Sequence, residues 1–125
     1  MALEDDDPVE VYRQEIAAVL PLTEEEWDCL LQEARQSGER GEFAKKRLIE
    51  SHLHLVLPVA ERYASGPLSM LELIQEGNCG LMRALDKFPE ARLDNFVAYA
   101  TSYIEGFISD AIARSKITPG GIGWR

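Results

Sequence analysis

The chain has 125 residues and a formal net charge of −9, because 22 acidic side chains face 13 Lys and Arg. This length fits one domain, which can bury about two-thirds of its unfolded surface without help from a disulfide or cofactor. The acidic excess disfavours bare nucleic acid and anionic membranes as partners, although a local patch can oppose the total.

The first two predicted helices carry clear start signals. Asp7 is a good N-cap, and Pro8 then occupies the first helical position. Apolar residues follow at helical spacing until Pro21. Thr23 and Glu26 form a capping-box pattern that predicts the start of a second helix.

The rest of the chain reads as three further helical segments. Residues 36–42 indicate a turn, and a long helix is expected over 43–63, which Pro58 should kink or divide. Helices are then predicted over 69–88 and about 95–114.

No segment alternates with the period of a strand, so the predicted fold class is all-α and compact. We expect an acidic tail over 1–6, a helical domain over 7–116 and a short tail over 117–125. No signal-peptide pattern or apolar run of 18 residues occurs, which predicts a cytoplasmic protein without a membrane partner.

Catalytic and metal-binding patterns are not found. Cys29 and Cys79 have no CxxC partner and no His at ligand spacing, which favours a reducing compartment over a metal site. His52 and His54 fall on different sides of a helix and make a poor metal pair. No Ser-His-Asp set or glycine-rich phosphate loop can be assembled, so no enzyme activity, cofactor or small-molecule substrate is predicted.

The segment 71–88, LELIQEGNCGLMRALDKF, has a core face and an edge without an obvious structural role. Gly77 and Gly80 lie in mid-helix at a cost of about 1 kcal/mol each relative to Ala, which indicates close approach of another backbone. Met82 falls at the border of the core face, beside polar residues. Either this polar edge is merely solvated, or it is a partner groove with Met82 as an adaptable apolar contact.

Four aromatic residues lie along one edge of the last predicted helix, beside an aliphatic stripe: Phe96, Tyr99, Tyr103 and Phe107. They either fill the core or stack unpaired bases, each such stack being worth about 1–3 kcal/mol. A basic run, formed by Arg35, Arg40, Lys45, Lys46 and Arg47, either is a solvated face or touches nucleic acid or a protein partner.

Three segments, AKKRLIESHLHLVLPVAERYA, LELIQEGNCGLMRALDKF and NFVAYATSYI, resemble in order and spacing conserved region 2 of the housekeeping-type sigma factors of bacterial RNA polymerase. DPVEVYRQEI with PLTEEEW is similar to the region just before it, so the resemblance spans about residues 7–115. It implies an all-helical domain that docks on the clamp helices of the polymerase largest subunit and reads and melts the promoter −10 element.

The resemblance also implies site residues. Those for core-polymerase binding are Glu72, Gln75, Glu76, Asn78 and Met82. Those for DNA are Phe88 and Tyr99 in a flipped-base pocket, Phe96 and Tyr103 as melting aromatics, and Arg92.

The chain departs from the family pattern on the DNA side. The family's usual tryptophan, arginine, base-reading glutamine, threonine and arginine are replaced by Ser102, Glu105, Gly106, Ser109 and Asp110. A usual aromatic, lysine, asparagine and arginine are replaced by Asp94, Asn95, His52 and His54. Most of these changes remove a donor or a positive charge, so we expect only weak binding of promoter −10 DNA.

Three hypotheses follow. The chain is a sigma factor or its fragment, with altered promoter preference; or it is a sigma-like regulator that occupies the clamp without reading DNA; or it is a helical adaptor unrelated to transcription. A helix-turn-helix encoded after Arg125 would favour the first hypothesis, and a stop codon the second.

Overall fold

The computed structural model describes residues 7–89 and 93–117, and these form helices and connecting turns without a strand. The predicted all-α fold class is therefore confirmed. The elements are α1 (Pro8–Ala17), α2 (Glu24–Ala34), α3 (Glu39–Glu50), a 3₁₀ turn (Leu53–Leu55), α4 (Val56–Arg62), α5 (Met70–Lys87) and α6 (Leu93–Ile117). The two predicted tails lie outside the described residues, apart from Ile117, which ends α6.

Side-chain caps begin three of these helices. The Asp7 carboxylate accepts a hydrogen bond from the Val9 amide at 3.0 Å, as the sequence predicted for α1. Thr23 and Glu26 form the predicted capping box of α2, and Ser69 and Glu72 form a second one at α5. Each cap satisfies amides that the first helical turn leaves unpaired, a contribution of about 0.5–2 kcal/mol.

The helical segment predicted over 43–63 is divided, as expected, but its start and the place of the division differ from the prediction. α3 begins at Glu39, since the turn is limited to the residues around Gly38, which has a positive φ of 95°. The helix then breaks at 51–55, where the Ser51 hydroxyl donates to the Leu48 carbonyl at 2.9 Å and competes with the helical ladder. Pro58 does not cause the break, because it lies in the first turn of α4, where no amide donor is required.

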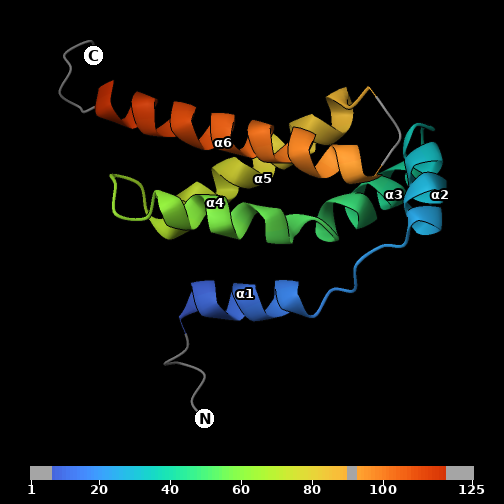
Figure 1. Ribbon diagram of the computed structural model, residues 1–125, viewed down its shortest axis with the longest axis horizontal. Helices are drawn as coiled ribbons and strands as arrows, with labels where there is room; N and C mark the ends of the chain where they lie inside the picture. Colours follow the sequence, from blue (N-terminus) through green and yellow to red (C-terminus); the bar gives the residue numbers. More distant parts are fainter. Residues whose placement is uncertain (1–6, 90–92, 118–125) are drawn as a thin grey trace.

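The centre of the fold is the contact between α5 and α6, which cross with α4 packed beside them (Figure 1). α1 lies on the side of α4 opposite to α6. A Cβ on Gly80 would lie 2.7 Å from the Tyr103 carbonyl oxygen, and one on Gly77 would lie 2.6 Å from Val56 Cγ1. The predicted close approach of another backbone is confirmed at Gly80, whereas the near neighbours of Gly77 are side chains of α4 and α6.

An aromatic cluster joins α2, the break around His52, the C-cap of α5 and the start of α6. The Phe96 ring lies 5.1 Å from both Trp27 and His52, and 5.2 Å from Phe88, between ring centroids. Trp27 and Phe96 are each 1% exposed, and Phe88 is 5% exposed. These rings are therefore part of the hydrophobic core.

Candidate functional site

α5 presents one face that the core does not use. Gln75, Cys79, Met82 and Asp86 lie within about 60° of one another at 100° per residue, and all four are exposed. We call these four residues the outer face of α5. Met82 is 48% exposed although it is apolar, whereas Leu81, on the opposite face, is fully buried. An exposed methionine among polar side chains is the composition of a contact surface that accommodates a partner.

The two glutamates assigned to polymerase binding flank this face, and both already have partners. The Glu72 carboxylate accepts from the Ser69 amide at 2.8 Å in the capping box of α5. Glu76 lies 3.7 Å from the Arg114 guanidinium of α6. Glu72 is thus held at the start of α5 and Glu76 between α5 and α6, so both carboxylates lie beside the outer face.

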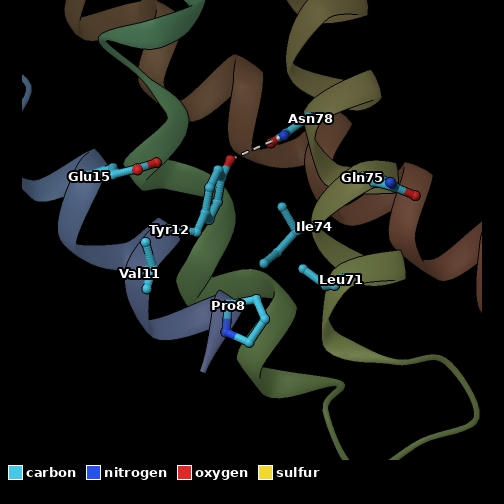
Figure 2. A pocket seen from close by; sticks show the side chains of 8 residues that line it. All are labelled: Pro8, Val11, Tyr12, Glu15, Leu71, Ile74, Gln75 and Asn78. Atoms are coloured by element: carbon cyan, nitrogen blue, oxygen red, sulfur yellow. Dashed lines mark hydrogen bonds between the residues drawn. The ribbon is translucent and has the colours of Figure 1, made fainter. Parts of the chain in front are cut away.

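Asn78 turns in the other direction, toward α1. Its side-chain Nδ2 donates to the Tyr12 hydroxyl at 3.2 Å, while Gln75 extends from α5 away from Tyr12 (Figure 2). The Asn78 Oδ1 is buried and has no hydrogen-bond partner. The five residues assigned to polymerase binding thus do not form one flat patch. Gln75 and Met82 are exposed outward, and Asn78 points into a groove.

This groove, which we call the α1–α5 groove, has a volume of about 650 Å³. Its walls are mostly apolar and come from the two helices: Pro8, Val11, Tyr12 and Glu15 of α1, and Leu71, Ile74, Gln75 and Asn78 of α5 (Figure 2). Leu71 is 50% exposed at its edge. The groove continues the outer face of α5 toward α1.

A second groove, of about 410 Å³, lies between α3 and α5, and Met82 and Asp86 line it together with Lys45 and Lys46. The Lys45 ammonium is 3.6 Å from Glu42, and that of Lys46 is 3.9 Å from Glu50. Exposed pairs of this kind contribute little to stability. Lys45 and Lys46 are thus exposed and paired with neighbouring carboxylates beside Met82.

The residues assigned to DNA divide into buried and half-exposed rings. Phe88 and Phe96 belong to the core, so neither offers a free ring face to a base in this conformation. Tyr99 and Tyr103 are half-buried on α6, with ring centroids 5.0 Å apart. Arg92 lies outside the described residues. The half-exposed aromatic edge thus consists of the two tyrosines and Phe107, over whose ring the Arg83 guanidinium carbon lies at 5.9 Å from the centroid.

The two phenols are held by a chain of hydrogen bonds. The Tyr99 hydroxyl donates to the Lys87 carbonyl oxygen at 3.0 Å and lies 3.3 Å from the Tyr103 hydroxyl. Because the Tyr99 proton is used by the carbonyl, Tyr103 donates to Tyr99. These hydrogen bonds hold both rings against the end of α5.

Beyond the tyrosines, three positions of α6 where the family carries donors, 105, 106 and 110, supply no free cation to DNA. Glu105 forms an ion pair with Arg62 at the end of α4, and this pair links two helices. Gly106 and Asp110 are exposed and contribute no cation. Sequence reasoning identified Glu105 as a lost positive charge but missed Arg62, because the two residues are 43 positions apart.

His52 is a core residue in this structure. Its Nδ1 lies 2.8 Å from the Leu48 carbonyl oxygen, which can only accept, so the ring nitrogen is the donor. Burial lowers the pKa of His52 below its ordinary value, and the nearby His54 contributes in the same direction. Within residues 7–89 and 93–117, no cluster of His, Cys, Asp or Glu is arranged to hold a metal ion. None of the helices described is long and apolar enough to span a membrane.

The fold and site define an all-helical domain in which an interaction face on one helix adjoins an aromatic edge on the next. The family model for sigma-70 region 2 matches residues 48–117, and the chain belongs to this family. The resemblance inferred from the sequence is confirmed.

Relatives with the name RNA polymerase sigma factor SigA match most of the chain. That of Lactococcus lactis subsp. cremoris is 43% identical over 108 residues, which cover 86% of this chain and 30% of that protein. That of Clostridium acetobutylicum is 42% identical over 108 residues, covering 86% and 28%. The protein from a Bacillus species is 41% identical over 107 residues, again 86% and 28%. The chain thus spans about three-tenths of the length of the curated relatives it matches.

Proposed function

We propose that this chain binds core RNA polymerase as the region 2 part of a sigma factor and acts in transcription initiation. The observation that carries the proposal is the outer face of α5, where Gln75 and the apolar Met82 are exposed although core packing gives them no role. Family membership and the names of the relatives support the same function.

The proposed contact on the polymerase is the pair of clamp helices of its largest subunit. Glu72 and Glu76 suit a basic partner, because their carboxylates border the outer face and the whole chain carries a net charge of −9. Gln75 supplies donors and acceptors, and Met82 supplies adaptable apolar contact. Asn78 completes the proposed set from within the α1–α5 groove.

The two exposed cysteines provide a test with an internal control. Cys79 lies in the outer face of α5, whereas Cys29 lies on α2. We expect core polymerase of Lactococcus lactis to slow the alkylation of Cys79 and leave that of Cys29 unchanged, as measured by mass spectrometry of the two peptides. Equal alkylation of Cys79 with and without bound polymerase would place the interface elsewhere.

Substitutions test the same interface by affinity. Gln75→Ala and Met82→Ala each remove an exposed side chain, so helicity should be retained while polymerase binding weakens by about 1–2 kcal/mol, or roughly 5- to 30-fold. Glu24→Ala on α2 is a matched exposed control that should change nothing. Unchanged affinity in both variants would contradict the proposed surface.

The proposed role in DNA binding is limited to weak contact with the −10 element. Tyr99 and Tyr103 can offer a stacking surface, but the ion pair between Glu105 and Arg62 occupies a cation that would otherwise attract phosphate. This ion pair favours the second candidate function, a sigma-like regulator that binds polymerase without reading promoter DNA.

Fluorescence anisotropy separates the two candidates. A −10 single strand and a scrambled strand of equal composition are titrated with the chain at low and moderate salt. Weak binding without preference is the expected result for the isolated chain. If preference for the −10 strand appears once core polymerase is bound, the sigma-factor role is supported, and if it does not, the regulator role is.

A further inference from the structure

The hydrogen bond between Tyr12 and Asn78 connects α1 to the proposed polymerase-binding helix. The two residues are 66 positions apart, and the bond is 3.2 Å long. We infer, on the basis of the proposed function, that Tyr12 is a positioning residue for polymerase binding, and that Tyr12 and Asn78 act as one unit that holds α1 beside the outer face of α5.

α1 is attached to the domain at few other points. Ile16 is buried, and the Arg13 guanidinium lies 2.7 Å from the Glu61 carboxylate of α4, in a pair exposed to solvent. Between α1 and α5 the α1–α5 groove remains open, with a volume of about 650 Å³. The bond from Tyr12 to Asn78 crosses from one wall of this groove to the other (Figure 2). It therefore sets the distance between the two walls.

Stability alone does not account for an amide at position 78. A hydroxyl both donates and accepts, so Tyr12 satisfies whichever amide atom of Asn78 faces it, and the other amide atom stays buried without a partner. A buried polar atom without a hydrogen bond is unfavourable, and an apolar side chain of similar size would avoid it. The amide is thus retained for its bond to α1.

Asn78 consequently differs from Gln75 in how it contributes to binding. Gln75 offers its carboxamide to solvent, whereas the carboxamide of Asn78 is directed at Tyr12. A partner seated on the outer face of α5 meets α1 as the adjoining wall, next to the exposed Leu71. Loss of either Tyr12 or Asn78 releases α1 from this position. Tyr12 therefore affects the affinity for polymerase although it lies outside the residues that the family model matches.

The test is a double-mutant cycle measured as affinity for core polymerase of Lactococcus lactis. Tyr12→Phe removes only the hydroxyl, and Asn78→Leu removes the amide at similar volume. Each should weaken binding about three- to tenfold, and the double variant should bind no more weakly than Asn78→Leu alone. Tyr63→Phe is the matched control, because it removes the same hydroxyl from a half-buried tyrosine that follows α4 and has no part in the proposed sites.

Thermal unfolding and circular dichroism of each variant distinguish positioning from general loss of structure. All affinities are measured well below every unfolding midpoint, so a variant that is merely less stable keeps its affinity. If Tyr12→Phe binds like the parent chain while Gln75→Ala binds weakly, this inference is wrong and the proposed function stands. Additive losses in the double variant, or an equal loss in Tyr63→Phe, also overturn it. If Gln75→Ala and Met82→Ala bind like the parent, the proposed function itself fails.

Discussion

Two glycines in mid-helix provide a matched pair of substitutions with opposite expected effects on stability. Gly80 is buried in α5, where a Cβ would lie 2.7 Å from the Tyr103 carbonyl oxygen and 3.0 Å from the Ile104 Cα. Gly106 is exposed in α6, and a Cβ there would meet nothing within 4 Å. Replacement by Ala therefore reduces the backbone entropy that folding must overcome at both positions, but it creates a clash only at Gly80.

The magnitudes follow from these two terms. Ala in place of Gly in a helix interior contributes about 1 kcal/mol, which is the whole expected effect of Gly106→Ala. At Gly80 the contacts are backbone atoms, which cannot rotate away, so α5 and α6 must separate. Overpacking of this kind costs about 1–3 kcal/mol or more, which outweighs the propensity gain. We expect Gly80→Ala to lower the free energy of unfolding by about 1–2 kcal/mol.

Urea unfolding followed by circular dichroism at 222 nm measures both variants against the parent chain. The two should differ by about 2–3 kcal/mol in free energy of unfolding, or on the order of 10 °C in midpoint temperature for a domain of this size. A Gly80→Ala variant as stable as the parent would show that α5 and α6 do not approach as closely as the structure places them.

Three further predictions concern pH, DNA and fold. Burial lowers the pKa of His52, so the folded state favours its neutral form. The free energy of unfolding should therefore have its full value above about pH 6.5 and decrease below that pH. His52→Asn should flatten this dependence, and an unchanged slope would exclude His52 as its source. Glu105→Arg with Gly106→Gln should raise affinity for a −10 strand over a scrambled one, since it releases Arg62 and adds donors; equal binding would refute this. Far-UV circular dichroism should show a helical spectrum that a chelator does not alter.

Local signals in the sequence predicted most of the helices. The N-caps at Asp7 and Thr23 each bond to a residue no more than three positions further along the chain. Such caps can therefore be predicted from a short stretch of sequence. The glycines at 77 and 80 indicated a close approach, since their presence in mid-helix has a cost that only packing offsets. The family motif over 71–88 supplied the residues assigned to polymerase binding, of which Gln75 and Met82 lie in the outer face of α5.

The break between α3 and α4 is a place where local reading went wrong. Pro58 is the strongest helix breaker in the segment, yet the helix divides at 51–55 because the side chains of Ser51 and His52 take the Leu48 carbonyl. The hydrogen bond to Leu48 also directs the His52 ring into the aromatic cluster, where it packs against Trp27 and Phe96. The place of the break thus follows from these two side-chain hydrogen bonds and from the burial of His52.

The sequence by itself determined the all-helical class, the family and the helix that carries the proposed polymerase-binding face, because helical periodicity and caps act over a few residues. Only the tertiary structure decided which aromatic rings are core, that Asn78 turns toward Tyr12, and that Glu105 is paired with Arg62. The physical reason is distance along the chain. Contacts that span 66 and 43 positions depend on how whole helices pack, and periodicity within one helix does not record them.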